Sequence, residues 1–273
     1  MKKLGTVLIG IFITLIIIIS VVPFVWVFVS SFKSNFDIIS GNAGFTQGLH
    51  PENYITAFKM APFLIFFRNS LLISIIGTML NLVTMSMAAY VIARFTLKFG
   101  NVVKLLFTSV LFIPGAALLY PLFTTMRLLN LYNSKTSLVL VYAGLGMATT
   151  FYIMLSYYRT IPKSLEEAAY IDGASFFRTY MQIILPLTKP CFATAGVLQF
   201  LLCWKEFQFA LTLTTGNEVR TVPIALYYFT SQFASDYGAM CAATTIIAIP
   251  SIIFYVVLQK QVINGLTAGS VKE

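Results

Sequence analysis

Residues 164–190, SLEEAAYIDGASFFRTYMQIILPLTKP, form a polar interruption in a chain that is otherwise strongly apolar. The stretch holds three of the nine acidic residues of the chain, placed beside alanines and a glycine. Long apolar runs precede and follow it. Short polar elements between long apolar runs are typical of a chain that crosses a lipid bilayer several times. The contrast between this stretch and its flanks therefore decides the fold class.

Composition supports the same interpretation. The chain has 273 residues, of which 58% are apolar and 10% charged, and its mean hydropathy is +0.86. Soluble domains are about 45–50% apolar and about 25% charged, so these values exclude an oily soluble enzyme. The apolar runs are continuous rather than alternating at every second residue, which favours helices over an outer-membrane barrel. We predict an all-α polytopic membrane protein.

The charged, cysteine and histidine residues exclude other classes of site. The net charge is +9, but the cations are scattered and form no basic cluster, so no nucleic-acid partner is expected. Cys191, Cys203 and Cys241 lie inside apolar runs without a CxxC pair and are predicted to be packing residues. His50, in a polar loop, is the only histidine. The sequence therefore predicts no metal site.

Six segments are long and apolar enough to cross a bilayer, which takes about 20 residues. The first follows Lys2-Lys3, is too long for a signal peptide and lacks a cleavage motif, so we expect it to be retained. We predict a single transmembrane domain over 1–273, with a loop at 160–188 and a tail at 260–273. The six predicted spans are 5–31, 67–93, 104–126, 137–159, 189–213 and 239–259.

The distribution of lysine and arginine predicts the orientation, because cytoplasmic loops are enriched in these residues. With the N-terminus inside, eleven of them fall in inner segments and six in outer segments. Both termini and the loop 160–188 are therefore predicted to be cytoplasmic, in a plasma membrane of the bacterial type. The outer segments 32–66 and 214–238 are longer than simple connections require. We expect the second of these to fold back against the helices.

The polar loop is predicted to form two short helices. Pro162 ends the preceding span, and Ser164 with Glu167 fits a capping box. Gly173 permits a break, and a second helical run follows in ASFFRTYMQII. Small, apolar and charged side chains together make a surface that another protein can approach closely. The alternative is an amphipathic connector on the inner leaflet, although three acids in seven residues disfavour an anionic membrane surface.

The same residues resemble a known motif. Residues 167–186 match the EAA motif at all seven of its fixed positions, namely Glu167, Ala168, Ala169, Gly173, Ile183, Leu185 and Pro186. That motif marks the permease subunits of binding-protein-dependent ABC importers. The chain resembles the maltose and multiple-sugar class of these permeases over its whole length, with support from SSFKS, RNSLLIS and QKQVINGLTAGSVK. The resemblance implies the type I importer permease fold.

The resemblance also implies a set of partners. In that family the EAA loop forms a coupling helix that docks into a cytoplasmic ATPase subunit. The complete importer contains two ATPase subunits, a second and different permease, and an extracytoplasmic solute-binding protein. This chain has no GxxxxGK[ST] phosphate loop, so ATP and Mg²⁺ are expected to bind the partner, with no cofactor here. The implied docking residues are Glu166, Glu167, Ala168, Ala169, Asp172, Gly173, Ala174, Phe176, Phe177 and Arg178.

A charged pair marks a candidate solute pathway. Lys205 and Glu206 are the charged residues that lie inside a predicted span and away from its ends, and such residues are functional candidates. Trp204, Phe207 and Gln208 flank them and supply groups that contact sugars. The family often has Asn in place of Lys205. The alternative is an interfacial tryptophan beside a snorkelling lysine. The resemblance also implies that the partner permease can hold most of the sugar contacts, as it does in some members of the family.

Other functions remain as alternatives. The same machinery can import a solute other than a sugar. A stand-alone secondary transporter would leave the EAA motif unexplained, and an intramembrane enzyme would need a catalytic group that the spans lack. The segment 220–236 is expected either to contact the solute-binding protein or to form a lid on its own helices. The tail is expected either to reach the ATPase or to fray.

Overall fold

The computed structural model describes residues 2–229 and 236–268, and all regular structure in these ranges is helical. The prediction of an all-α polytopic fold is confirmed. The chain divides into two compact units. The first unit contains Met1–Phe63 and Ile224–Pro250, and the second contains Leu64–Pro223 and Ser251–Glu273. The prediction of a single domain stays a prediction.

The first unit begins with one long apolar helix. Helix α1 (Lys2–Ser30) includes the candidate span Leu8–Ser30, whose mean hydropathy is 3.0. None of this span's best apolar window is buried, so the helix presents its side chains to lipid or to a partner. The other helices of this unit are α2 (Asn35–Ile39), α3 (Glu52–Met60) and the first part of α14 (Tyr237–Ala268).

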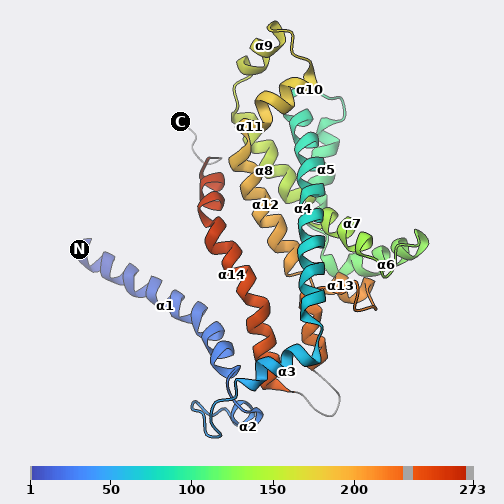
Figure 1. The fold of residues 1–273 in the computed structure, drawn as a ribbon. Helices are drawn as coiled ribbons and strands as arrows, with labels where there is room; N and C mark the ends of the chain where they lie inside the picture. The colour runs from blue at the N-terminus through green and yellow to red at the C-terminus, as the bar shows by residue number, and fades with distance from the viewer. Residues whose placement is uncertain (1, 230–235, 269–273) are drawn as a thin grey trace. The chain divides into compact units, whose positions relative to one another are not determined.

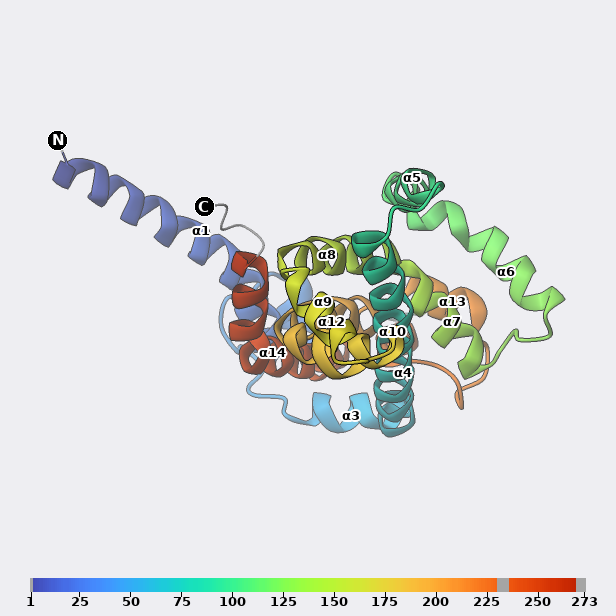
Figure 2. The same ribbon diagram turned by 90° about the horizontal axis from the view of Figure 1, so that it is seen from above.

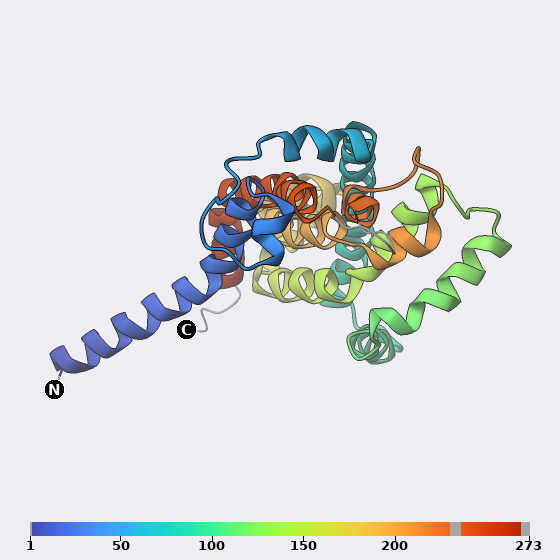
Figure 3. The ribbon, with the colours of Figure 1, turned by 90° about the horizontal axis from the view of Figure 1, so that it is seen from below.

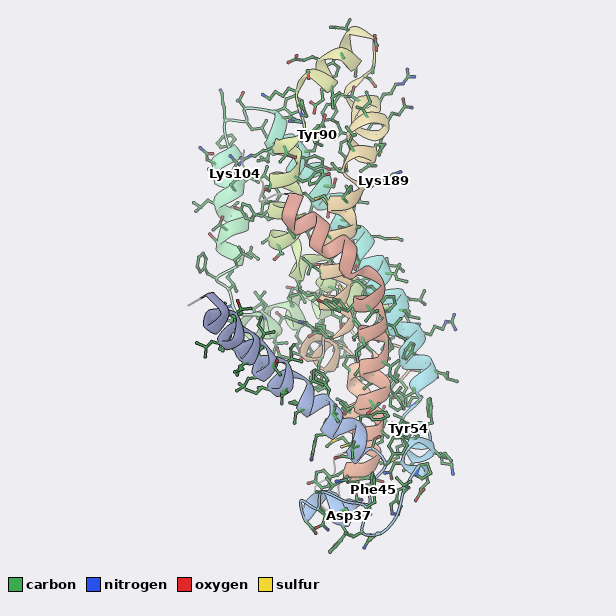
Figure 4. The ribbon with its side chains drawn as sticks, turned by 90° about the vertical axis from the view of Figure 1, so that its left-hand side faces the viewer. Asp37, Phe45, Tyr54, Tyr90, Lys104 and Lys189 are labelled. Atoms are coloured by element: carbon green, nitrogen blue, oxygen red, sulfur yellow. The ribbon has the colours of Figure 1, made fainter. Side chains whose placement is uncertain are left out.

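The segment after α1 is a folded cap rather than an open loop. Figure 4 shows Asp37, Phe45 and Tyr54 at one end of the first unit. Asp37 accepts hydrogen bonds from the Thr46 hydroxyl, Asn42 Nδ2 at 3.1 Å and the Gln47 amide at 3.3 Å. The bond from Thr46 is the main reason why the pKa of Asp37 falls to about 2. The buried carboxylate of Asp37 therefore holds together the segment that follows the first span.

The second unit is arranged around α4 (Phe63–Arg94), a helix of 32 residues without a break (Figure 1). Figure 3 shows the same ribbon from below, with α13 in orange beside the green helices α6 and α7, which it contacts. The other helices are α5 (Gly100–Val110), η1 (Gly115–Leu118), α6 (Leu119–Leu128), α7 (Lys135–Leu145), α8 (Met147–Thr160), α9 (Ser164–Ile171), α10 (Phe176–Thr179), the π-helix η2 (Tyr180–Ile184), α11 (Leu185–Leu187), α12 (Lys189–Trp204) and α13 (Gln208–Leu213). Helix η3 (Val222–Phe229) crosses the boundary between the units.

Some of the predicted spans are broken. By length and composition, Leu8–Ser30, Phe63–Arg94 and Tyr237–Val256 are continuous candidate spans, and three bent helix pairs raise the number to six in the described residues. The predicted span 104–126 is not a continuous helix, because the chain bends by 102° between α5 and η1. Pro114 has extended backbone angles at that break and cannot donate a helical hydrogen bond.

The predicted span 137–159 is bent by 48° between α7 and α8. The bend leaves backbone carbonyls without their helical donors. Gln199 Nε2 donates to the Tyr142 carbonyl at 2.8 Å, and Asn81 Nδ2 donates to the Ala143 carbonyl at 2.7 Å. A Cβ at Gly146 would lie 1.6 Å from Gln199 Oε1, so glycine makes room for this contact. Side chains from α4 and α12 thus satisfy the bend, as a membrane interior requires.

The core of the second unit lies where α4, α8 and α12 meet. The cluster contains Met85, Ala89, Tyr90, Phe151, Met154, Leu155, Tyr158, Ile161, Tyr180, Ile184, Cys191 and Ala195. Cys191, Cys203 and Cys241 are all buried and unpaired. Their interpretation as packing residues is confirmed.

Candidate functional site

The docking loop, defined here as residues 164–187, lies at one end of the second unit. Figures 1 and 2 place α9 and α10 beyond the ends of α4 and α12. Ile161 has extended backbone angles, as Pro162 predicts. The predicted capping box is wrong, because Lys163 already has helical angles and Ser164 lies inside the first turn. Glu166 and Glu167 occupy that turn, where the helix dipole favours them.

The break at Gly173 is confirmed. Its φ is +77°, a left-handed conformation that side chains with a Cβ rarely adopt. The Gly173 amide donates to the Tyr170 carbonyl at 3.0 Å, and the Ala174 amide donates to the Ala169 carbonyl at 2.9 Å. These two bonds form a Schellman motif. A Cβ at Gly173 would meet nothing within 4 Å, so backbone conformation, rather than crowding within the chain, is what favours glycine here.

The second half of the docking loop starts again at Ser175, whose hydroxyl accepts the Arg178 amide at 3.4 Å. Helix α10 continues into the π-helix η2 and then into α11. The predicted second helical run is therefore present, with one irregular turn. Single π-helical turns are rare in proteins overall, and those that occur often lie at functional sites.

An ion pair fastens the docking loop to α4. Arg94 Nε donates to Glu166 Oε1 at 2.6 Å, and Arg94 Nη2 donates to the Ile161 carbonyl at 2.9 Å. The Arg94 and Glu166 side chains are only 5% and 9% exposed. Glu166, which the resemblance implied as a docking residue, is thus held by a contact inside its own chain. Arg94 is a residue that sequence reasoning missed, because 72 positions separate it from its partner.

Aromatic side chains make a second attachment. The Phe176 ring lies 5.5 Å from Tyr90 and 5.6 Å from Phe95, measured between ring centroids. Ser86 Oγ shares hydrogen bonds with the hydroxyls of Tyr158, at 2.5 Å, and Tyr180, at 2.6 Å. Figure 4 shows Tyr90 at the end of α4 near the docking loop. The loop is therefore a firmly attached element.

The remaining residues implied for docking divide into two groups. Ala169 is buried and Ala174 is half-buried. The exposed ones are Glu167, Ala168, Asp172, Gly173, Phe176, Phe177 and Arg178. Leu165, Ile171 and Phe177 add apolar exposure to this surface, at 41%, 86% and 59%. The exposed face mixes apolar and charged groups, which is the character of a protein-binding surface.

The candidate solute residues lie at a break instead of inside a helix. Helix α12 ends at Trp204, and Lys205 is its C-cap, so the predicted span 189–213 consists of two helices rather than one. Trp204 is 1% exposed and packs against Phe67, with ring centroids 5.3 Å apart. It also packs against Phe200. Its position in the core leaves it outside any solvent-facing site in this structure.

Glu206 explains the break. Its carboxylate accepts the Phe209 amide at 2.8 Å and the Ala210 amide at 3.0 Å, which caps α13. It also accepts the Tyr142 hydroxyl at 2.9 Å. Lys205, Phe207 and Gln208 remain exposed beside it. We call Lys205–Phe207 the span-five break.

Polar residues that sequence reasoning passed over hold the next segment in place. Asn69 Nδ2 donates to the carbonyls of Glu218, at 2.8 Å, and Arg220, at 3.0 Å, while Ser70 Oγ accepts the Val222 amide. Asn133 Oδ1 accepts the amides of residues 215 and 216. The folding back expected for 214–238 is confirmed for the part from 215 to 222. Residues 230–235 of the expected binding-protein contact, and 269–273 of the tail, lie outside the described residues.

Comparisons with known proteins agree on one family. The family model described as the binding-protein-dependent transport system inner membrane component matches residues 80–267. The sulfoquinovosyl glycerol transport system permease protein of Agrobacterium fabrum is 33% identical over 92% of this chain and 88% of its own length. The trehalose transport system permease protein of Mycobacterium tuberculosis is 33% identical over 95% of each chain.

One solved structure has a similar fold. It is the crystal structure of a bacterial ABC transporter involved in the import of the acidic polysaccharide alginate. The TM-score is 0.81 and the sequence identity 20%, with 95% of this chain and 96% of that chain covered.

Proposed function

This chain belongs to the family of binding-protein-dependent transport system inner membrane components, and on that premise we propose that it is the permease subunit of an ATP-driven importer for a sugar or an oligosaccharide. The relatives named above carry sulfoquinovosyl glycerol and trehalose in their names. A trehalose/maltose permease of Thermococcus litoralis is 32% identical over 94% of this chain. The shared class of these solutes supports a sugar over another solute.

The exposed face of the docking loop is the observation that carries the proposal. It combines exposed Ile171 and Phe177 with the charged Glu167 and Arg178 at one tip of the second unit. The chain has no phosphate-binding loop of its own. The tip therefore suits an ATPase subunit, which binds ATP and Mg²⁺ and hydrolyses the nucleotide. The permease itself is non-catalytic, and two ATPase subunits serve a pair of different permeases.

The orientation follows from the same end of the molecule. Lys104 and Lys189 lie in the half of the second unit that holds Tyr90 and the docking loop (Figure 4). Cations favour the cytoplasmic side, so this end faces the cytoplasm. The opposite end, with the segment 214–222, then faces the solute-binding protein. Exposed Lys205, Phe207 and Gln208 at the span-five break offer a cation, an aromatic ring and an amide to a passing sugar.

Affinity purification of a tagged chain in mild detergent, from its own cells, tests the proposal. The native chain is expected to bring an ATPase, a second permease and a solute-binding protein, all identified by mass. Gly173→Arg is expected to lose the ATPase. Gly41→Arg is the matched control, because Gly41 also has a positive φ, of +67°, and open space around it. It is expected to keep the ATPase.

The control separates backbone strain from docking. Equal loss of the ATPase from both variants would make strain the cause and would overturn the docking role. A native chain that purifies alone would contradict the importer itself. The co-purified binding protein is then titrated with trehalose and with maltose, and binding of neither sugar, together with binding of a non-sugar solute, would replace the sugar in the proposal.

A further inference from the structure

Helix α4 is the continuous element of the second unit. Apart from 67–93, which lies in α4, the predicted spans wholly inside this unit are 104–126, 137–159 and 189–213, and each of these three is broken. Helix α4 instead runs from Phe63 to Arg94 without interruption. A continuous helix transmits a displacement along its axis, whereas a broken one absorbs part of it at the bend.

One end of α4 is tied to three of the helices in the docking loop, α9, α10 and η2. Arg94 bonds the Ile161 carbonyl, where α8 ends, and the Glu166 carboxylate of α9. Tyr90 stacks on Phe176 of α10, and Ser86 bonds the Tyr180 hydroxyl of the π-helix. The Arg94–Glu166 pair is the charged contact of this set and is almost fully buried. The loop cannot shift without either moving α4 or breaking these contacts.

The other end of α4 is tied to the span-five break and to the segment after it. Phe67 packs on Trp204, the last residue of α12 before the break. Asn69 bonds the carbonyls of Glu218 and Arg220, and Ser70 bonds the Val222 amide. All of these contacts lie inside the second unit. Helix α4 thus joins the docking loop to the candidate solute region through direct contacts at both of its ends.

The routes along the chain itself are less direct. From the docking loop to α12, the chain passes a π-helix and a bend of 76° at Thr188. Going backwards from the loop, α8 meets the bend at Gly146. Each of these points allows local adjustment in place of a rigid displacement.

We propose that α4 carries movement of the docking loop to the span-five break, and that Arg94 is the positioning residue that attaches α4 to the loop. This inference rests on the proposed function, because it takes the ATPase as the source of the movement. Neutralising Arg94 leaves the Glu166 carboxylate buried without its partner, so α9 detaches from α4. Nucleotide-driven movement then stops at the loop, although the exposed docking face remains intact.

The test measures movement at the far end of α4 in the purified complex with its ATPase. Gln208→Cys places a reactive thiol at an exposed position beside the break, while the native cysteines are buried at 1%, 2% and 7% exposure and react slowly. Labelling with a membrane-impermeant maleimide is timed without nucleotide and with Mg-ATP plus vanadate. In the Gln208→Cys chain we expect the labelling rates with and without Mg-ATP plus vanadate to differ by at least about fivefold, which is the lower limit of typical coupling between sites.

Adding Arg94→Gln, or separately Glu166→Gln, is expected to reduce the ratio of the two labelling rates to about one. The ATPase is still expected to co-purify and to hydrolyse ATP. Arg94→Lys is expected to restore the rate change, since the charge is kept. Lys98→Gln, an exposed cation four residues further on, is the control and is expected to keep the full change. A purely structural role for Arg94 would lower the yield of complex without altering the rate change per complex.

A nucleotide-dependent change that persists in both neutral variants would overturn the inference, as would a Gln208→Cys chain that shows no change at all. Loss of the change in Lys98→Gln would also overturn it, because cation number rather than the ion pair would then be responsible. Failure of the native chain to recover an ATPase is a different result, which contradicts the proposed function and not the role of α4.

Discussion

The docking loop and the span-five break are both polar interruptions of apolar sequence, but they use their acidic residues differently. In the loop, Glu166 is paired inside the chain and Glu167 is exposed. At the break, Glu206 is engaged by two backbone amides and a tyrosine hydroxyl. Polar residues of a membrane protein thus satisfy their own backbone and neighbours first. The residues that remain exposed after this are the ones available to partners and solutes.

The largest effect on stability is expected at Arg94. Arg94→Ala leaves a buried carboxylate uncompensated, which costs about 3–5 kcal/mol of folding free energy. Glu167→Ala removes an exposed charge one residue along and is expected to change stability by less than about 0.5 kcal/mol. Thermal unfolding of both variants in one detergent measures the difference. Equal destabilisation would contradict the structure, in which Glu166 is buried in an ion pair with Arg94 and Glu167 is exposed.

Glu206 is expected to behave as a structural residue at the break. Glu206→Ala removes the cap of α13 and a partner of Tyr142, at a cost of about 1–3 kcal/mol. Glu206→Gln keeps an acceptor and is expected to recover about half of the loss. Lys205→Ala, at the exposed neighbour, is the control. If Lys205→Ala destabilises the chain more than Glu206→Ala, the assignment of structural and exposed roles at the break is reversed.

A smaller effect on stability is expected at the bend between α7 and α8. Gly146→Ala places a Cβ against Gln199 Oε1 and displaces the amide that bonds the Tyr142 carbonyl, which costs about 1–2 kcal/mol. The double variant Gly146→Ala with Gln199→Ala relieves the clash, so the two costs are expected not to add. Chemical denaturation of the three variants measures the coupling. Strict additivity would mean that Gly146 and Gln199 do not share this contact.

The smallest effect on stability is expected in the folded segment that follows α1. Asp37 has a pKa of about 2, below its ordinary value of 3.8, because Thr46, Asn42 and Gln47 bond its carboxylate. A lowered pKa means that the folded state prefers the charged form, so the stabilisation is complete above the ordinary value and is lost as pH falls toward 2. Proteolysis of the cap is expected to stay slow until the pH falls below 3.8. Asp37→Asn is expected to remove that pH dependence, and an unchanged profile would contradict it.

Local sequence predicted the fold class, the positions of the apolar segments and the helix–glycine–helix form of the docking loop, because composition, proline and glycine act over a few residues. Pro114 and Gly173 are examples, since each limits its own backbone. The Arg94–Glu166 pair could not be predicted in this way, because its partners are distant in sequence. The end of α12 was missed for a similar reason, since Glu206 is held partly by Tyr142, 64 residues away.

Photo-crosslinking in native membranes tests the central claim most directly. A photoreactive amino acid is placed at Ile171, which is 86% exposed on the docking loop, and for comparison at Leu128, which is 84% exposed at the end of α6. Irradiation is expected to join the chain to an ATPase subunit from position 171 and not from position 128. An ATPase adduct from both positions, or none from position 171, would contradict the claim that the exposed face of this loop is where the chain meets its ATPase.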